Sequence, residues 1–282
     1  MAIKLMIDSA SDIGEKEAKE MGIIMVPMII TIGEEDFYDG VNITPREFYE
    51  KLIESDELPK TTQINPYRFE EAIKENLKDG DELLIITISS KLSGTYSSAL
   101  QAAGMFDGRV RVIDSMNAAI GERILCEYAL RLIDEGLSLD EIVNELEEKK
   151  SKIHVLALID TLEYLKKGGR ISSTVAFAGE LISLKPVIGV VGGEVKMVGK
   201  AIGSRRGNNL LNRLVESKGG IDFTMPYGTI WSGLDDSMLQ KYINDSASLW
   251  EGHTDKIPSY ILGGTIGTHI GPGAIGVAFF EK

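Results

Sequence analysis

The sequence predicts an α/β protein of two domains, with a mainly parallel sheet in the first domain and a mixed sheet in the second. The chain has 282 residues, enough for two domains of the usual size of about 100–200 residues. In the first half, short apolar runs alternate with helical patterns, which favours a doubly wound parallel sheet. After Lys150 the apolar runs contain more glycine, which indicates a mixed sheet. We therefore expect domains at residues 1–150 and 151–282.

Four apolar runs predict the strands of the first domain. The second of them contains Pro27. Because proline has no N–H for the ladder, this strand is expected to lie at a sheet edge or to be interrupted. The expected strands are Leu5–Asp8, Ile23–Ile32, Glu82–Ile88 and Arg109–Asp114.

Three helices of the first domain have readable starts. Thr44-Pro-Arg-Glu47 is a capping box with proline at the first helical position. Asn65-Pro66 opens a second helix, with apolar residues spaced four apart behind it. Ser138-Leu-Asp-Glu141 opens a third, which ends in charged residues before Lys150.

The second domain begins with His154–Ile159, which is expected to be a strand, and Leu162–Lys167, which is expected to be a short helix. Lys185–Lys200 predicts two strands joined by a turn at Gly192-Gly193. Further strands are expected at Gly228–Trp231, Ser259–Leu262 and Ile275–Phe280.

The charge balance excludes one broad class of partner. The formal net charge is −13, and such a field repels phosphate backbones, so nucleic acid is not an expected partner. No apolar run approaches the roughly 20 residues of a membrane-spanning helix, and the N-terminus turns acidic too early for a secretory signal. The expected location is the cytoplasm, without stable membrane insertion.

Motifs for metals and nucleotide cofactors are missing. The only cysteine, Cys126, lies in an apolar helical pattern and is expected to be a buried small hydrophobe. No metal-ligand spacing of the His-Glu-x-x-His kind occurs. The segment from Gly193 to Ala201 has five residues between its glycines where a phosphate-binding P-loop has four. Neither a metal nor a cofactor is therefore expected.

Ser93 invites a test for nucleophilic catalysis because it lies on a strand-to-helix turn. The elbow of hydrolases needs glycine two residues before and two after the serine, where this chain has Lys91 and Thr95. A base could come from a distant histidine, and His269 lies between flexible glycines. A serine hydrolase or acyltransferase using Ser93 and His269 thus remains the alternative.

The same turn also fits an anion site made of neutral donors. A helix that begins near Ser93 or Gly94 offers free backbone N–H groups. Hydroxyl groups from Ser93 and from the pair Thr61-Thr62 could add hydrogen bonds. Such a site can hold a carboxylate without a buried cation.

Six separated motifs together resemble one family, the DegV family of bacterial fatty-acid-binding proteins. They run from residue 8 to residue 274 in the family's order. The motifs are Asp8-Ser-Ala-Ser-Asp12, Lys60-Thr-Thr-Gln63, Ile88-Ser-Ser-Lys-Leu-Ser-Gly-Thr-Tyr96, Val112-Ile-Asp-Ser115, Thr161-Leu-Glu-Tyr-Leu-Lys-Lys-Gly-Gly-Arg-Ile171 and Ile266-Gly-Thr-His-Ile-Gly-Pro-Gly-Ala274.

The resemblance implies an α/β/α parallel-sheet domain beside a two-layer mixed-sheet domain, with a long-chain fatty acid held between them. It also implies a carrier that performs no bond chemistry itself and presents the fatty acid to a separate ATP-dependent fatty acid kinase. A sensor of another amphipathic carboxylate is the further alternative. The residues that match the family's carboxylate site are Thr61, Thr62, Ser93, Gly94, Thr268 and His269.

Arg170 completes a basic run with Lys166 and Lys167 in an acidic chain. One interpretation is a helix C-terminus favoured by its dipole. The other is a contact with the kinase or with the acyl-phosphate group. The chain departs from the family's usual residues at Ile7, Thr62, Ile64 and Ala119, and Thr62 keeps the hydroxyl.

Overall fold

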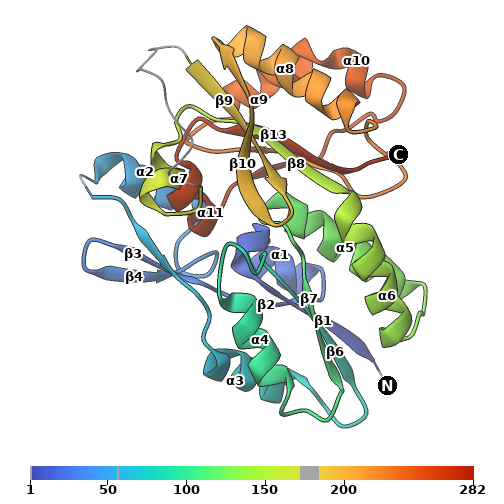
Figure 1. Cartoon of the computed structure of the whole chain (residues 1–282). Helices are drawn as coiled ribbons and strands as arrows, with labels where there is room; N and C mark the ends of the chain where they lie inside the picture. Colours follow the sequence, from blue (N-terminus) through green and yellow to red (C-terminus); the bar gives the residue numbers. More distant parts are fainter. Residues whose placement is uncertain (1, 56, 172–183) are drawn as a thin grey trace.

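The computed structural model describes residues 2–55, 57–171 and 184–282 (Figure 1). Its first part is built on a four-stranded parallel sheet with strand order β2-β1-β6-β7. Consecutive parallel strands need crossovers, and helices supply them, as the alternation in the sequence predicts. The strands are β1 (Ile3–Asp8), β2 (Ile24–Val26), β6 (Glu82–Thr87) and β7 (Val110–Asp114).

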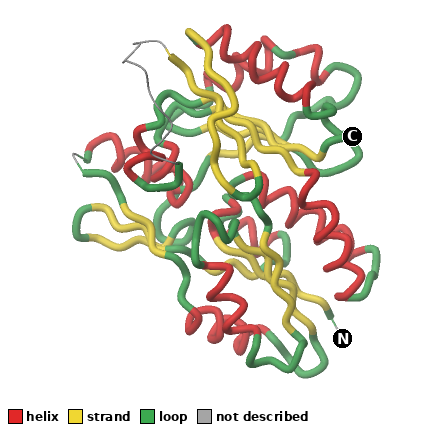
Figure 2. Tube along the Cα trace, in the orientation of Figure 1, coloured by secondary structure: helices red, strands yellow, loops and turns green. Residues whose placement is uncertain are grey.

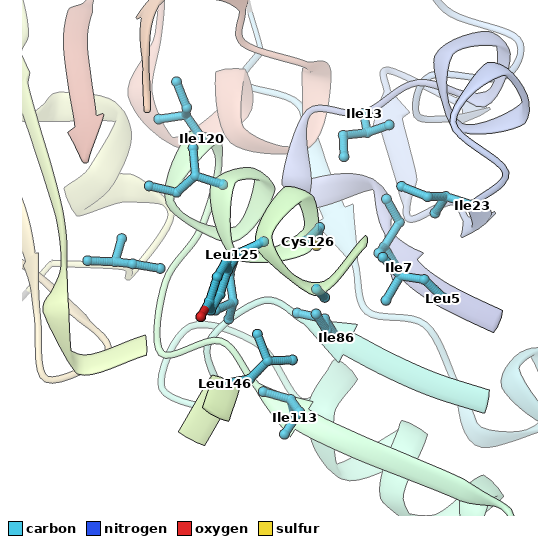
Figure 3. Close-up of a cluster of buried hydrophobic side chains, with 14 of the residues drawn as sticks. Leu5, Ile7, Ile13, Ile23, Ile86, Ile113, Ile120, Leu125, Cys126 and Leu146 are labelled. Carbon is cyan, nitrogen blue, oxygen red and sulfur yellow. The ribbon is translucent and has the colours of Figure 1, made fainter. Parts of the chain in front are cut away.

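Helices cover both faces of this sheet. Leu5 and Ile7 of β1 pack with Leu125 and with other residues of the helices on one face (Figure 3). Met6, which points to the opposite face, packs with Phe69 and its neighbours. The predicted α/β/α layering is confirmed. The helices are α1 (Glu15–Glu20), α3 (Pro66–Asn76), α4 (Thr95–Ala103), α5 (Ile120–Asp134) and α6 (Leu139–Lys149).

Cys126 lies in the first of these cores, fully buried (Figure 3). Burial raises the pKa of its thiol well above the ordinary value, so it packs as a small apolar group. The prediction from the sequence is confirmed for this residue.

A small three-stranded antiparallel sheet, of order β4-β3-β5, adjoins the parallel sheet. The predicted strand Ile23–Ile32 is divided at Pro27, because β2 ends at Val26 and β3 (Ile29–Ile32) belongs to the other sheet. The interruption that proline predicts is confirmed. The remaining elements are β4 (Glu35–Tyr38), β5 (Lys60–Thr62) and helix α2 (Pro45–Glu54), which starts with the predicted capping box at Thr44.

The second part is a six-stranded mixed sheet of order β10-β9-β8-β13-β11-β12, in which only the β11–β12 pair is parallel among the described strands. Figure 2 shows the strands of this part in yellow with helices in red beside them. Its strands are β8 (Ile153–Leu158), β9 (Leu184–Val191), β10 (Glu194–Ile202), β11 (Gly228–Trp231), β12 (Ser259–Ile261) and β13 (Ile275–Phe280).

Helices α8 (Ser204–Ser217), α9 (Ser237–Asp245) and α10 (Ala247–Trp250) cover one face of the mixed sheet. On the other face, Val155 of β8 packs in the core that contains α5. The short helices α7 (Glu163–Lys167) and α11 (Gly264–Ile270) lie beside α2, between the two large sheets (Figure 1). In the described part of the chain, no helix combines the length and apolar character required to cross a bilayer.

Candidate ligand-binding site

A cavity lies between the parallel-sheet part and the mixed sheet. Its empty volume is about 870 Å³, including the open mouth. Both halves of the chain line it, for example Ile88 and Ala119 from the first half and Ile188 and Ile230 from the second. The lining is mostly apolar, with a few polar side chains among it, which is the usual composition of a small-molecule site. The polar lining residues are Thr61, Gln63, Ser93, Arg170, Thr265 and His269.

His269 and Thr61 meet at this cavity. The Nε2 atom of His269, on α11, lies 2.9 Å from Oγ1 of Thr61, on β5. The other ring nitrogen, Nδ1, has no hydrogen-bond partner among the described residues, and the ring packs against Gly168, where a Cβ atom would have no room. Burial, and then the charge of Arg170, lower the pKa of His269 to about 4. The imidazole is therefore neutral at neutral pH.

Ser93 lies in the loop between β6 and α4 and is half-buried at the cavity wall. Its Oγ atom is 2.9 Å from Oγ1 of Thr95 and accepts a hydrogen bond from the Thr95 N–H at 3.3 Å. The adjacent Gly94 lies against the side chain of Gln63, so that a Cβ atom there would clash with it. The loop thus brings the Ser93 hydroxyl to the cavity wall and packs Gly94 against the amide of Gln63, which comes from the segment after β5 and also lines the cavity.

Arg170 is part of the cavity wall and also follows the C-terminus of α7. Its Nη1 donates to the Gly168 carbonyl oxygen at 2.6 Å, and its Nε donates to the Leu92 carbonyl oxygen at 3.3 Å. These bonds hold a permanent positive charge next to Ser93. The anion site deduced from the loop pattern contained neutral donors only, whereas Arg170, predicted as a helix end or as a contact for the kinase or the acyl-phosphate group, lines the same cavity.

Three of the predicted residues do not line the cavity, namely Gly94, which packs against Gln63 as described above, Thr62 and Thr268. Thr62 is exposed, because successive side chains of β5 point to opposite faces and Thr61 takes the cavity side. Thr268 is buried, and its hydroxyl donates to the Gly264 carbonyl oxygen at 2.8 Å within α11. Their contribution to ligand binding stays a prediction.

Gln63 and Thr265 are polar lining residues that the sequence analysis did not single out. Gln63 stands two positions after Thr61. Because side chains two positions apart in a strand point to the same face, a strand that extends past Thr62 would place Gln63 on the same side as Thr61. For Thr265 no pattern in the sequence gives a comparable signal.

The geometry does not favour the serine hydrolase alternative. The described residues show no hydrogen bond between Ser93 and His269, and each side chain bonds a threonine instead. A histidine with a pKa of about 4 is also a weak base at neutral pH. Among the described residues there is no group of three or more His, Cys, Asp or Glu side chains placed to hold a metal ion.

Comparisons with known proteins agree with this architecture. The family model described as an uncharacterised protein of the DegV family matches residues 2–282. A DegV domain-containing protein of Caldanaerobacter subterraneus is 36% identical over 284 residues, which cover 99% of each chain.

Two solved structures are similar over the whole of both chains. One is described as fatty acid binding of a DegV family protein from Thermus thermophilus, with 31% identity and a TM-score of 0.88. The other is DegV, a fatty acid binding protein from Bacillus subtilis, with 29% identity and a TM-score of 0.83. Since the family model and the relatives span essentially the complete chain, this chain belongs to the DegV family.

Proposed function

We propose that the chain binds a long-chain fatty acid in the cavity between its two large sheets. The observation that carries this proposal is the joining of a mostly apolar wall to a cluster of Thr61, Ser93, Arg170 and His269. An acyl tail fits the apolar part, and a carboxylate fits the cluster. The fatty acid binding described for the Thermus thermophilus and Bacillus subtilis relatives supports the same ligand class.

The energetics divide between the two ends of such a ligand. Each methylene removed from water contributes about 0.8 kcal/mol, so the tail supplies most of the affinity. The carboxylate must be well hydrogen-bonded, because an unpaired buried charge costs several kcal/mol. The guanidinium of Arg170 supplies the opposite charge, and the hydroxyls of Thr61 and Ser93 supply donors.

The neutral state of His269 suits this arrangement. If its Nε2 carries the proton, Nε2–H donates to Thr61 Oγ1 and leaves the Thr61 hydroxyl proton free to point at the carboxylate. In that tautomer the unpartnered Nδ1 carries a lone pair instead of an unsatisfied N–H. The histidine then orients the threonine without adding charge.

The chain would act as a carrier and perform no bond chemistry itself. A separate ATP-dependent fatty acid kinase, acting in the cytoplasm, would phosphorylate the bound carboxylate. Two observations support this. Among the described residues, Ser93 bonds Thr95 and no histidine, and Arg170 lies at the carboxylate end, where an acyl-phosphate would form. No cofactor is required for such a role.

Native mass spectrometry of protein purified from cells, followed by calorimetry with palmitate and oleate, tests the proposal. A bound fatty acid should appear as added mass, and Ser93→Ala should weaken binding by about 1–3 kcal/mol. Ser97→Ala is the matched control, because Ser97 is an exposed serine in the first turn of α4. Flat calorimetry with both acids would contradict the proposal, and another co-purified carboxylate would favour the sensor alternative.

A further inference from the structure

Helix α11, which carries His269, has no N-terminal cap of its own. Its N-cap residue is Gly263, which has no side chain to accept a hydrogen bond. Two carboxylates from the other half of the chain take this role. The N–H of Gly263 donates to Asp12 Oδ1 at 2.8 Å, and the N–H groups of Gly264 and Thr265 donate to the two oxygens of Asp39 at 3.0 Å each.

Asp39 is held firmly in place for this task. It directly follows β4, its own N–H donates to the Met28 carbonyl oxygen at 3.0 Å, and its side chain is 3% exposed. Carboxylates are favoured at a helix N-terminus, where unpaired N–H groups and the helix dipole both attract negative charge. Burial raises the pKa of the Asp39 carboxyl group above its ordinary value, against the lowering effect of the hydrogen bonds from Thr265 and Gly264. A carboxylate offers a separate acceptor oxygen to each of these two N–H groups, whereas an asparagine offers only one acceptor oxygen.

The body of α11 is fixed against the same part of the chain. A Cβ atom at Gly264 would clash with Ile30 of β3, and one at Gly267 would clash with Phe48 and Tyr49 of α2, so neither position has room for a side chain. Figure 1 shows α2 and α11 side by side. Thr61 belongs to β5, in the same three-stranded sheet as β4, the strand that leads into Asp39. One small sheet therefore supports both partners of the Thr61–His269 hydrogen bond.

We propose that Asp39 is a positioning residue for the carboxylate site: it anchors the N-terminus of α11 and thereby holds His269 against Thr61, with Asp12 assisting. The expected effect on ligand affinity rests on the proposed fatty-acid function, but the positioning of His269 can be measured without ligand. The helix has only seven residues, too few for helical structure to persist without external support. Loss of the anchor at its first turn should therefore reach His269 in its last turn.

Asp39→Asn is the test variant, because asparagine keeps the size but replaces one acceptor oxygen with an NH₂ group that faces an N–H donor. Asp235→Asn is the matched control. Asp235 is an exposed aspartate whose Oδ1 accepts from the Ser237 N–H at 3.0 Å, at the start of α9, and it does not line the cavity.

The first readout is the pKa of His269 in ligand-free protein, followed by NMR of the imidazole and assigned by comparison with His269→Ala. In the wild type this pKa is lowered to about 4. We expect Asp39→Asn to raise it toward the ordinary value, because a released ring reaches water, and Asp235→Asn to leave it unchanged. An unchanged His269 pKa in Asp39→Asn would overturn the inference, whatever ligand the protein binds.

The second readout is palmitate affinity in a double-mutant cycle of Asp39→Asn with His269→Ala. We expect Asp39→Asn to weaken binding about tenfold in the wild-type background and to have little further effect once His269 is absent. Equal losses in both backgrounds would mean that Asp39 acts only through general stability, which refutes the inference. If Asp39→Asn does not fold, Asp12→Ala, which removes the one hydrogen bond that Asp12 accepts from Gly263 at the start of α11, is judged by the same two readouts. Failure of wild-type protein to bind palmitate would refute the proposed function, and the NMR result would still decide on the anchor.

Discussion

Thr61 and His269 are 208 positions apart in the chain, yet Thr61 Oγ1 and His269 Nε2 lie 2.9 Å from each other. The bond joins β5 of the small sheet to α11, and both residues line the cavity. Two parts of the chain that are distant in sequence therefore build one polar cluster, and its members should act together on a ligand.

The first prediction concerns this pair. Thr61→Val keeps the side-chain shape and removes the hydroxyl, so palmitate binding should weaken by about 1–3 kcal/mol in calorimetry, the usual effect of losing a hydrogen bond to a charged group. Combining it with His269→Ala should cost little more than the larger single effect, because both changes remove one network.

Thr62→Val is the matched control for this prediction, since Thr62 is the adjacent, exposed threonine of the same strand. It should bind palmitate with nearly wild-type affinity. A loss in Thr62→Val as large as that in Thr61→Val would favour the assignment made from family resemblance over the cavity geometry.

The second prediction concerns Arg170. Arg170→Ala removes the charge that contributes to the lowered pKa of His269 and the bond to the Leu92 carbonyl oxygen. We expect fatty-acid binding to weaken by about 1–3 kcal/mol. The relative loss of acyl-phosphate formation with the cognate kinase should be larger, because phosphorylation adds negative charge at this end of the ligand.

Lys167→Ala is the control for Arg170, because Lys167 is an exposed cation of the same basic run, paired with Glu163 at 2.6 Å. It should leave fatty-acid binding unchanged. If Arg170→Ala retains both binding and full acyl-phosphate production, Arg170 only closes the end of α7 and has no role in the site.

Much of the fold could be predicted from the sequence because its strands are apolar runs between readable helix starts. Strands β4 and β5 were not predicted, since Glu35–Tyr38 and Lys60–Thr62 are short and largely polar. They form by pairing with β3, and such tertiary pairing leaves no hydrophobic period to detect.

The site was predictable to a similar extent. Ser93 and His269 stand out because hydroxyl and imidazole groups next to glycines suggest chemistry. The choice between Thr61 and Thr62 needed the strand, because neighbouring residues of a strand face opposite ways. Apolar lining residues such as Ile188 and Ile230 have the same pattern as any buried strand residue, so no sequence signal separates a cavity wall from a core.

The third prediction concerns the pH dependence of stability. His269 has a pKa of about 4 in the folded protein and an ordinary value near 6.5 when unfolded. Between these two pH values the unfolded chain binds more protons at this residue than the folded chain does. Keeping the imidazole neutral therefore costs nothing above about pH 6.5, and the free energy of unfolding falls as the pH drops from 6.5 toward 4. The loss should amount to about 2 kcal/mol between pH 7 and pH 5.

Urea denaturation at these two pH values measures the effect. His269→Gln should show a smaller decrease in the free energy of unfolding than the wild type. His253→Gln, the same change at an exposed histidine, should keep the wild-type decrease. Identical pH dependence in His269→Gln and the wild type would mean that the imidazole is not held neutral in the folded protein.

The fourth prediction concerns Glu122, a fully buried carboxyl group on α5. Neither of its oxygens has a hydrogen-bond partner among the described residues. Burial, followed by the nearby charges of Asp8, Asp12 and Asp114, raises its pKa well above the ordinary value. The folded protein therefore holds a proton here that the unfolded chain has released, and this residue's contribution to stability declines as the pH rises from the unfolded pKa to the folded one.

Glu122→Met should consequently raise the free energy of unfolding by about 1–3 kcal/mol at pH 8, because it removes a buried polar group that makes no hydrogen bond. The gain should be smaller at pH 5, where the wild-type carboxyl group costs less. Glu148→Met, at an exposed position of α6, should change stability by less than about 0.5 kcal/mol at either pH. Destabilisation by Glu122→Met at both pH values would show that the carboxyl group has a stabilising partner, such as a bound water between the neighbouring acids, and that its charge is not the dominant cost.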